Sequence, residues 1–227
     1  KFMSKTVAET IKNLTYQHLN KNNGVILGQC LSAVGWVQNT IPPQKKGIIE
    51  LQMTDVAGAG YAVGCALAGS RPIFVIRFQS FLWLNSSPIV MHAAKTKEIF
   101  GYNCPVFVRA IASEGIGSGP LHTNCYHSPF ASMPGLQICA PMTPNEYKNI
   151  WKAFKKNNQP MLVSEHRRSY KSSIEFKDEI KKDSKITIFA ISAGRFNLEK
   201  AKNILMKKNI NCDIFHIYWI KPFKVKK

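Results

Sequence analysis

The sequence predicts an α/β protein: a doubly wound, mostly parallel β-sheet followed by the start of a second α/β domain. Short apolar runs typical of buried strands alternate with longer stretches of helical periodicity along most of the chain. Strands that alternate with helices form parallel sheets with helices on both faces. A chain of 227 residues with 45% hydrophobic residues also has enough apolar surface to bury such a core.

The larger expected domain covers residues 1–170. Its apolar runs are expected to be strands, at 24–29, 47–52, 71–78, 104–111, 136–141 and 160–166. Helices are expected between them, at about 5–20, 57–69, 88–100 and 143–157. The last helix begins with Thr143 and Pro144, and Glu146 follows the threonine by three positions. This is the pattern of a capping box with proline at the first helical position.

A polar, charge-dense segment at 171–184 interrupts this rhythm and is expected to be a linker. A new βαβ unit begins after it, with KITIFAIS, NLEKAKNILMKKN and CDIFHIYWIKPF in 185–227. A unit of about 43 residues is too small to bury a good core alone. We therefore expect it to be part of a carboxyl-terminal domain, and the natural protein to be longer.

The formal net charge of +18 is the unusual global feature. Nucleic acid, an anionic membrane surface or an acidic partner protein are the general partners of such a charge. The lysines, however, lie in helical-looking stretches without interleaved aromatic residues or a nucleic-acid-binding module. No run approaches the roughly 18 apolar residues of a membrane span. We expect a solvated basic surface, with neither nucleic acid nor membrane as partner.

The six cysteines are scattered, without a CxxC pair or a histidine at metal-ligand spacing. We expect reduced, mostly buried thiols in a cytoplasmic protein, and no metal-ligating residue in this chain.

An acid follows the second expected strand directly, in the segment MTDVAGAGYAVGCALAG. Asp55 therefore lies where the carboxyl ends of parallel strands meet and ligands bind. Its carboxylate could accept a proton or a hydrogen bond from a ligand. Helix capping is the alternative interpretation, since Thr54 and Asp55 are both good N-cap residues.

Aromatic residues crowd the end of the next strand, in RFQSFLWLNSS. Phe78, Phe81 and Trp83 could stack on a flat heterocycle, although such residues more often belong to the core. A glycine-rich loop, SEGIGSGPLHTNCYHSP, then presents His122 and His127. Each histidine is either a proton-transfer group or a hydrogen-bonded loop residue.

These segments, in this order, resemble the β subunits of pyruvate and branched-chain 2-oxo acid dehydrogenases, which use thiamine diphosphate. A more distant resemblance is to the pyrimidine domains of transketolase and deoxyxylulose-phosphate synthase. The resemblance covers most of the chain, through GIIELQMTD, AGAGYAVGCALAGSRP, RFQSF, HAAKTKEIFG, NCPVFVRA, GPLH, MPGLQICAPMTPNE, QPMLVSEHRRSY and NINCDIFHIYWIKPF. It implies the fold of a pyrimidine-binding domain and an enzyme that contributes the aminopyrimidine half of a shared active site.

The resemblance also implies roles for individual residues. Asp55 stands where the family has a glutamate that hydrogen-bonds the aminopyrimidine ring. Phe81, near Phe78, stands where an aromatic residue packs on that ring, and Met53 lies on the strand end beneath it. His122 stands at the active-site histidine that faces the substrate. Asp55 and His122 are thus the expected catalytic residues, and Asp55, Phe81, Met53 and Phe78 the expected cofactor-binding ones.

Two departures from the family pattern stand out. Aspartate in place of glutamate retracts the carboxylate at position 55 by roughly 1.3 to 1.5 Å, and catalysis tolerates such misplacement poorly. Ser87-Pro88 replaces the usual Asp-Gln, which affects a helix start at a subunit contact. The reaction is therefore expected to be either divergent or weak.

The partners follow from what the chain lacks. It has no Gly-Asp-Gly followed some 25 to 30 residues later by Asn, the pattern that holds magnesium and diphosphate in thiamine enzymes. An α-type subunit, or a fused amino-terminal half, would supply Mg²⁺ and diphosphate binding. Self-association as a dimer within a heterotetramer, through 57–69 and 78–100, and a lipoyl-bearing acyltransferase are further expected partners. A split transketolase-like ketol transferase and a non-catalytic binding scaffold are the alternatives.

Overall fold

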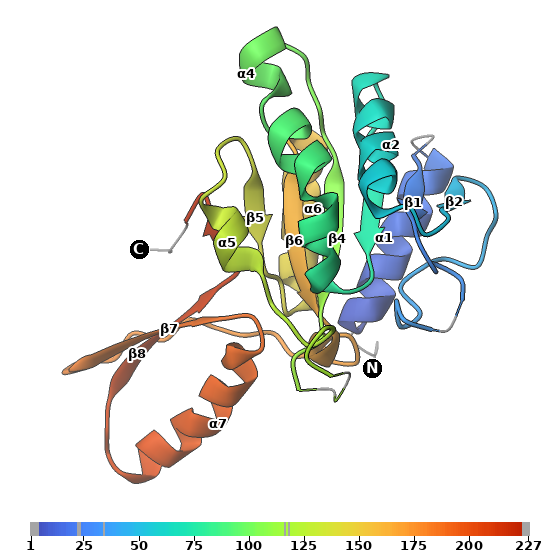
Figure 1. Ribbon diagram of the computed structural model, residues 1–227. Coiled ribbons are helices and arrows are strands. Elements are labelled where there is room, and N and C mark those ends of the chain that lie inside the picture. The colour runs from blue at the N-terminus through green and yellow to red at the C-terminus, as the bar shows by residue number, and fades with distance from the viewer. Residues whose placement is uncertain (1–4, 22–23, 34, 116, 118, 224–227) are drawn as a thin grey trace.

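The computed structural model describes residues 5–21, 24–33, 35–115, 117 and 119–223. A seven-stranded sheet forms the centre of this described part (Figure 1), in the order β2-β1-β3-β4-β6-β5-β9. The first six strands in this order pair in parallel, and β9 pairs with β5 in the antiparallel sense. The strands are β1 (Ile26–Gly28), β2 (Ile48–Glu50), β3 (Ile73–Ile76), β4 (Phe107–Ala112), β5 (Gln137–Cys139), β6 (Met161–His166) and β9 (Trp219–Lys221).

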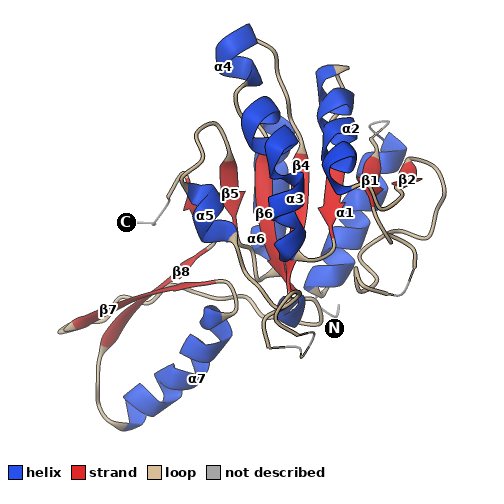
Figure 2. Ribbon diagram, in the orientation of Figure 1, coloured by secondary structure: helices blue, strands red, loops and turns tan. Residues whose placement is uncertain are grey.

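Helices cover both faces of the sheet, which confirms the doubly wound α/β prediction (Figure 2). One face packs against α1 (Val7–Lys21) and α6 (Pro144–Lys156). The other packs against α2 (Asp55–Leu67), α5 (His127–Ala131) and the helical segment that follows β3. The strands of the inner sheet are buried on both faces, so they appear in the sequence as continuous apolar runs.

The helix α6 begins as its sequence predicts. Thr143 is the N-cap, and its hydroxyl accepts the backbone N–H of Glu146 at 3.2 Å. The second half of the capping box differs, because the Glu146 carboxylate accepts the backbone N–H of Met142 at 2.9 Å. The Glu146 carboxylate therefore binds outside its own helix and does not close the capping box.

The helix expected at 88–100 begins earlier and is interrupted. It consists of η1 (Gln79–Phe81), α3 (Leu82–Ser86), the π-helical η2 (Ser87–Ala93) and α4 (Thr96–Phe100). Pro88 has no N–H to donate to the carbonyl four residues earlier, so an α-helical hydrogen bond is missing at this point. The wider π turn begins there.

A second, smaller unit lies apart from the central sheet, at the lower left of Figure 1. It contains the parallel pair β7 (Ile186–Ile191) and β8 (Cys212–Ile217), with α7 (Gly194–Lys207) packed against them. Glu179, from the polar segment before it, forms a backbone bridge with Ile214.

The expected final strand is divided between the two sheets. After β8 the chain crosses to the central sheet, where β9 pairs with β5 and the backbone N–H of Ala140 donates to the carbonyl of Tyr218 at 2.8 Å. The physical reason is the side chain of Trp219, which is buried in the core against α6. The apolar run 212–221 therefore forms one strand in each of the two sheets.

The six cysteines all lie in the described part of the chain, and none of them forms a disulfide there. Across the described ranges, no helix has the length and apolar character needed to cross a membrane. Nor does any group of three or more histidine, cysteine or acidic residues, among those placed, come together at metal-binding distances.

Candidate functional site

The residues singled out from the sequence meet at the carboxyl ends of neighbouring strands. Met53 and Asp55 follow β2, Phe78 and Phe81 follow β3, and His122 lies in the loop after β4. Because β2, β1, β3 and β4 are adjacent in the sheet, these three connections share one edge. This is the edge at which parallel α/β sheets bind ligands.

Asp55 is the first residue of α2, and its carboxylate does not cap the helix. The N-cap residue is Thr54, whose side chain makes no capping hydrogen bond. The carboxylate oxygen Oδ1 of Asp55 instead accepts the side-chain amide of Asn85 at 3.3 Å. The acid is therefore oriented by α3 and not by its own helix.

Phe78 and Phe81 are both in contact with His122. The imidazole stacks on Phe78, with 4.4 Å between ring centres and 23° between ring planes. It meets Phe81 edge-on, with 5.6 Å between centres. The hydroxyl of Ser113 donates to the backbone carbonyl of His122 and holds the loop at this place. Nδ1 of His122 is buried and has no hydrogen-bond partner among the described residues.

Arg77 completes the cluster, although its sequence position alone did not predict it. Its guanidinium lies over the Phe81 ring, 4.7 Å from the centre. It donates to the side-chain oxygen of Gln29 at 2.5 Å and approaches the Met53 sulfur at 3.5 Å. Met53 and Phe81 are therefore connected through Arg77. An arginine at the end of the otherwise apolar run RPIFVIRF was the signal that could have revealed it.

A second buried arginine lies at the carboxyl end of β6. Arg167, directly after β6, places its guanidinium 4.2 Å from the centre of the Phe78 ring and donates to the backbone carbonyl of Arg77 at 2.8 Å. Neither arginine has a carboxylate within ion-pair distance in the described part of the chain. Buried cations are normally paired, so this edge of the sheet is suited to an anionic ligand group.

Asp55, Asn85, Arg77 and Phe81 line a small hollow of about 10 Å³, which has room for about one water molecule. A heterocycle would therefore lie against the mouth of the hollow. The lining fits an aminopyrimidine ring, because it provides a carboxylate for a ring nitrogen and an aromatic face for the flat ring.

Trp83 and His127, the other two residues predicted as candidates, contact different neighbours. Trp83 packs against Tyr126 and Phe130, with ring centres 5.6 and 5.4 Å away. His127 contacts Cys125, whose sulfur is 3.0 Å from its Nδ1. Burial lowers the pKa of His127 and raises the pKa of Cys125, so this pair is uncharged near neutral pH.

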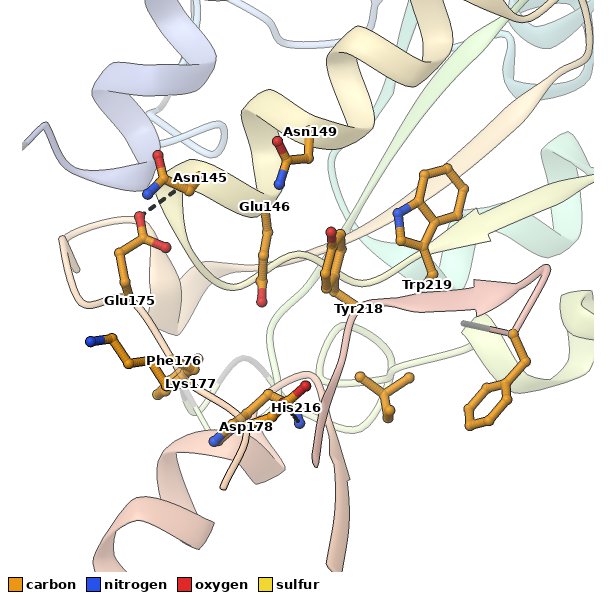
Figure 3. A pocket seen from close by; sticks show the side chains of 12 residues that line it. Asn145, Glu146, Asn149, Glu175, Phe176, Lys177, Asp178, His216, Tyr218 and Trp219 are labelled. Atoms are coloured by element: carbon orange, nitrogen blue, oxygen red, sulfur yellow. Dashed lines mark hydrogen bonds between the residues drawn. The ribbon is translucent and has the colours of Figure 1, made fainter. Parts of the chain in front are cut away.

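A much larger cleft, of about 810 Å³, lies where the two units meet (Figure 3). It is lined by residues of α6, β8 and β9 and of the polar segment before β7, among them Asn145, Glu146, Asp178, His216, Tyr218 and Trp219. None of the residues expected to be catalytic or cofactor-binding lies in it. Size alone does not make it the site, since the chemically matched groups gather at the smaller hollow.

Comparison with known proteins identifies the family of the chain. The family described as "Transketolase, pyrimidine binding domain" matches residues 17–173, more than half of the chain. The chain belongs to this family. The site residues Met53, Asp55, Phe78, Phe81 and His122 all lie within the matched range.

Curated relatives of this pyrimidine-binding chain include β subunits of 2-oxo acid dehydrogenases. The 2-oxoisovalerate dehydrogenase subunit beta of Bacillus subtilis (strain 168) is 32% identical over 126 residues, which are 55% of this chain and 38% of the relative. The pyruvate dehydrogenase E1 component subunit beta of Rickettsia bellii is 27% identical over 193 residues, covering 79% of this chain and 59% of the relative. The chain thus spans less than two thirds of the relatives it matches.

Solved structures share the fold of this pyrimidine-binding chain. A transketolase from Campylobacter jejuni superposes with a TM-score of 0.75 at 17% identity, over 94% of this chain and 35% of the transketolase. A split-gene transketolase in an inactive β4 tetramer gives a TM-score of 0.71 at 14% identity, over 97% of this chain and 73% of that protein. These similarities confirm the expected fold class.

Proposed function

We propose that this chain is the β-type subunit of a thiamine-diphosphate-dependent 2-oxo acid dehydrogenase and that it contributes the aminopyrimidine half of the active site. The observation that carries the proposal is the meeting of Asp55, Phe81 and His122 at the carboxyl edge of a pyrimidine-binding domain. The β-subunit relatives support the reaction class.

Within this proposal each residue has a defined task. The Asp55 carboxylate exchanges a proton with a nitrogen of the aminopyrimidine ring, and Phe81 packs on the ring face. Met53 and Phe78 support that face, one at the exposed rim and one from the core. His122, held against Phe78 and Phe81, moves a proton at its ring nitrogens during acyl transfer. When bound, thiamine diphosphate supplies the nucleophilic carbon and the electron sink that decarboxylate a 2-oxo acid.

Arg77 and Arg167 are the groups that receive the negative charge of the substrate. Both are buried, and both lack a carboxylate partner in the described part of the chain. A guanidinium binds a carboxylate through two parallel hydrogen bonds. A 2-oxo acid brings such a carboxylate, which would supply the missing countercharge.

The other half of the site comes from a partner. The sequence has no motif for diphosphate or magnesium. An α-type subunit, or an amino-terminal half fused to the same polypeptide, therefore holds Mg²⁺ and the diphosphate. A lipoyl-bearing acyltransferase is the proposed acceptor of the acyl group, and the cytoplasm the proposed location.

The second candidate is half of a split transketolase-like ketol transferase. The similarity to a split-gene transketolase over 97% of the chain favours it, and the two unpaired arginines would suit a sugar phosphate as well as a carboxylate. A non-catalytic scaffold is the third possibility, in which Asp55 has no ligand.

The proposed function is tested by isothermal titration of thiamine diphosphate with magnesium present. We expect no measurable binding to the purified chain, because the diphosphate carries most of the ligand's charge and this chain has no motif that receives it. We expect binding once the chain is complexed with the diphosphate-binding partner. Sub-micromolar binding by the chain alone would refute the shared site, and no binding by the complex would favour the scaffold.

The same complex distinguishes the two reactions. Release of carbon dioxide from a 2-oxo acid identifies the dehydrogenase. Transfer of a two-carbon ketol unit from a ketose phosphate to an aldehyde, without carbon dioxide release, identifies the ketol transferase.

A further inference from the structure

Asn85 occupies an unusual position for an amide side chain. It lies on the short helix α3 and is only 2% exposed. Its Nδ2 donates to the Phe81 carbonyl at 2.9 Å and to the Asp55 carboxylate at 3.3 Å. Rotating the amide by 180° would place its oxygen against two acceptors, so the hydrogen bonds determine which end faces Asp55.

The position of Asn85 relative to Asp55 matters because Asp55 is one methylene shorter than the glutamate of the resembled family. A shorter side chain places its carboxylate closer to its own backbone. The amide of Asn85 contacts Oδ1 and leaves Oδ2 of Asp55 without a partner among the described residues. One oxygen is thus held in place, while the other can still bind a ring nitrogen.

The other end of the same amide lacks a hydrogen-bond donor within the described ranges. Oδ1 of Asn85 is buried and has no hydrogen-bond donor among the described residues, and Asn85 lines the hollow together with Asp55, Arg77 and Phe81. Buried acceptors are nearly always satisfied in folded proteins. The hollow has room for about one water molecule, which can donate this hydrogen bond without any group of the cofactor.

We propose that Asn85 is a positioning residue for the aminopyrimidine: it fixes the shortened Asp55 carboxylate at the place where the ring nitrogen binds. This inference rests on the proposed function and deepens it. Asn85 acts through Asp55, so its contribution is specific to the ring nitrogen and absent for a ligand that lacks this atom.

The test measures cofactor affinity in the complex with the diphosphate-binding partner. The probes are thiamine diphosphate and a pyridine analogue in which carbon replaces the ring nitrogen N1 of the pyrimidine. Asn85→Leu keeps the size of the side chain and removes the amide. It should weaken binding of thiamine diphosphate about tenfold, the size expected for one hydrogen bond to a charged group. It should leave binding of the analogue unchanged within about twofold.

A matched control and a second variant keep the result interpretable. Ser87→Ala, a change at an exposed residue two positions further along the chain, should affect neither ligand. In an Asp55→Glu background the carboxylate no longer needs the amide to reach the ring, so Asn85→Ser should cost less affinity there than in the native background. This comparison also serves if Asn85→Leu fails to fold.

The possible results distinguish failure of the proposed function from failure of the role proposed for Asn85. If the native complex binds no thiamine diphosphate, the proposed function fails and the inference fails with it. If the complex binds thiamine diphosphate and Asn85→Leu weakens both ligands equally, or neither, Asn85 is a structural residue and only the inference is overturned. An equal cost of Asn85→Ser in both backgrounds also overturns it.

Discussion

The guanidinium of Arg195 donates two hydrogen bonds to the carboxylate of Glu146, at 2.8 and 2.5 Å. Glu146 belongs to the first turn of α6, against the central sheet, and Arg195 to the first turn of α7, in the small unit. Arg195 is fully buried and also lies 4.5 Å from the centre of the Phe176 ring. This pair therefore joins the two units by charge, while β9 joins them by backbone hydrogen bonds.

We expect Arg195→Met to lower the free energy of unfolding by about 3 kcal/mol, because it leaves the Glu146 carboxylate buried without its partner. Urea unfolding followed by circular dichroism measures the change. Adding Glu146→Gln to Arg195→Met should restore part of the loss, since the uncompensated charge is then gone. Lys200→Met, at an exposed site on the same helix, is the control. An equal loss from this control would contradict the assignment.

Asp55→Asn should nearly abolish turnover of the reconstituted enzyme while barely changing stability. Asparagine cannot exchange the proton, but it keeps the shape of the side chain. Because Asp55 does not cap α2, even Asp55→Ala should cost less than the roughly 1 kcal/mol of a lost N-cap. Steady-state assays and thermal melts measure the two effects. Full activity in both variants would show that Asp55 is not the catalytic acid.

Asp55→Glu reports whether the site has adapted to the shorter side chain. If Asn85 and the local backbone hold Asp55 where the ring binds, the longer glutamate should crowd the ring and lower turnover by about tenfold. Turnover above that of the native enzyme would mean instead that the native carboxylate falls short of the ring. The KM for thiamine diphosphate, measured beside kcat, shows whether the crowding acts on binding.

Stability should fall as the solution is acidified, because His166 is buried at the end of β6. Burial, and then the charges of Arg168 and Arg167, lower the pKa of His166 to about 4. The Glu114 carboxylate, 3.5 Å from Nε2, is half-exposed and does not offset this. An unfolded histidine titrates near pH 6.5. Between these values the unfolded state binds more protons, so stability is full above about pH 6.5 and is lost toward pH 4.

The expected loss from His166 is about 3 kcal/mol, from the difference between the two pKa values. Urea unfolding at pH 7.5 and pH 5 should show about 2 kcal/mol of this loss, because the rest develops only between pH 5 and pH 4. His166→Asn keeps an acceptor for the backbone N–H of Arg168 and should flatten the pH dependence. His92→Asn, at an exposed histidine, should leave the pH dependence as in the native chain. An unchanged slope in His166→Asn would contradict the prediction.

Self-association is expected through the helices that follow β2 and β3. These helices expose several large apolar side chains, among them Val56, Tyr61, Leu67, Met91, Ile99 and Phe100. Tyr61→Glu combined with Ile99→Glu should convert a dimer to a monomer in sedimentation without unfolding it. The exposed pair Phe189→Glu and Ile204→Glu, in the small unit, should leave the dimer intact. Dissociation by the second pair alone would place the contact elsewhere.

The sequence was sufficient to predict the strands that are buried on both faces and the helix that begins with a capping residue. The strands β3, β4 and β6 are continuous apolar runs, and α6 starts at a capping residue, so local chemistry determines them. The run 212–221 divides between β8 and β9 because Trp219 is buried in the core of the central sheet. That contact joins residues far apart in the sequence, so the local pattern does not predict it. The early start of the helix before Pro88 likewise depends on how its residues pack against α2.

For the candidate site, the sequence predicted only those residues that directly follow a strand or lie in the loop after it. Met53, Asp55, Phe78, Phe81 and His122 lie together as their strand-end positions imply. Asn85 and Arg77 were missed because their significance lies in contacts with residues 30 and 48 positions away. No periodicity or motif encodes such contacts, since they follow from the order of the strands in the sheet.

Strand β9 also determines how this chain must be made. It covers the free edge of β5, yet β5 leaves the ribosome well before Trp219 does. At ordinary rates of synthesis the interval is on the order of ten seconds. Throughout it, the nascent sheet presents an unpaired strand edge of the kind that recruits other chains. The central sheet therefore cannot complete its outer edge during translation until the small unit has also been synthesised.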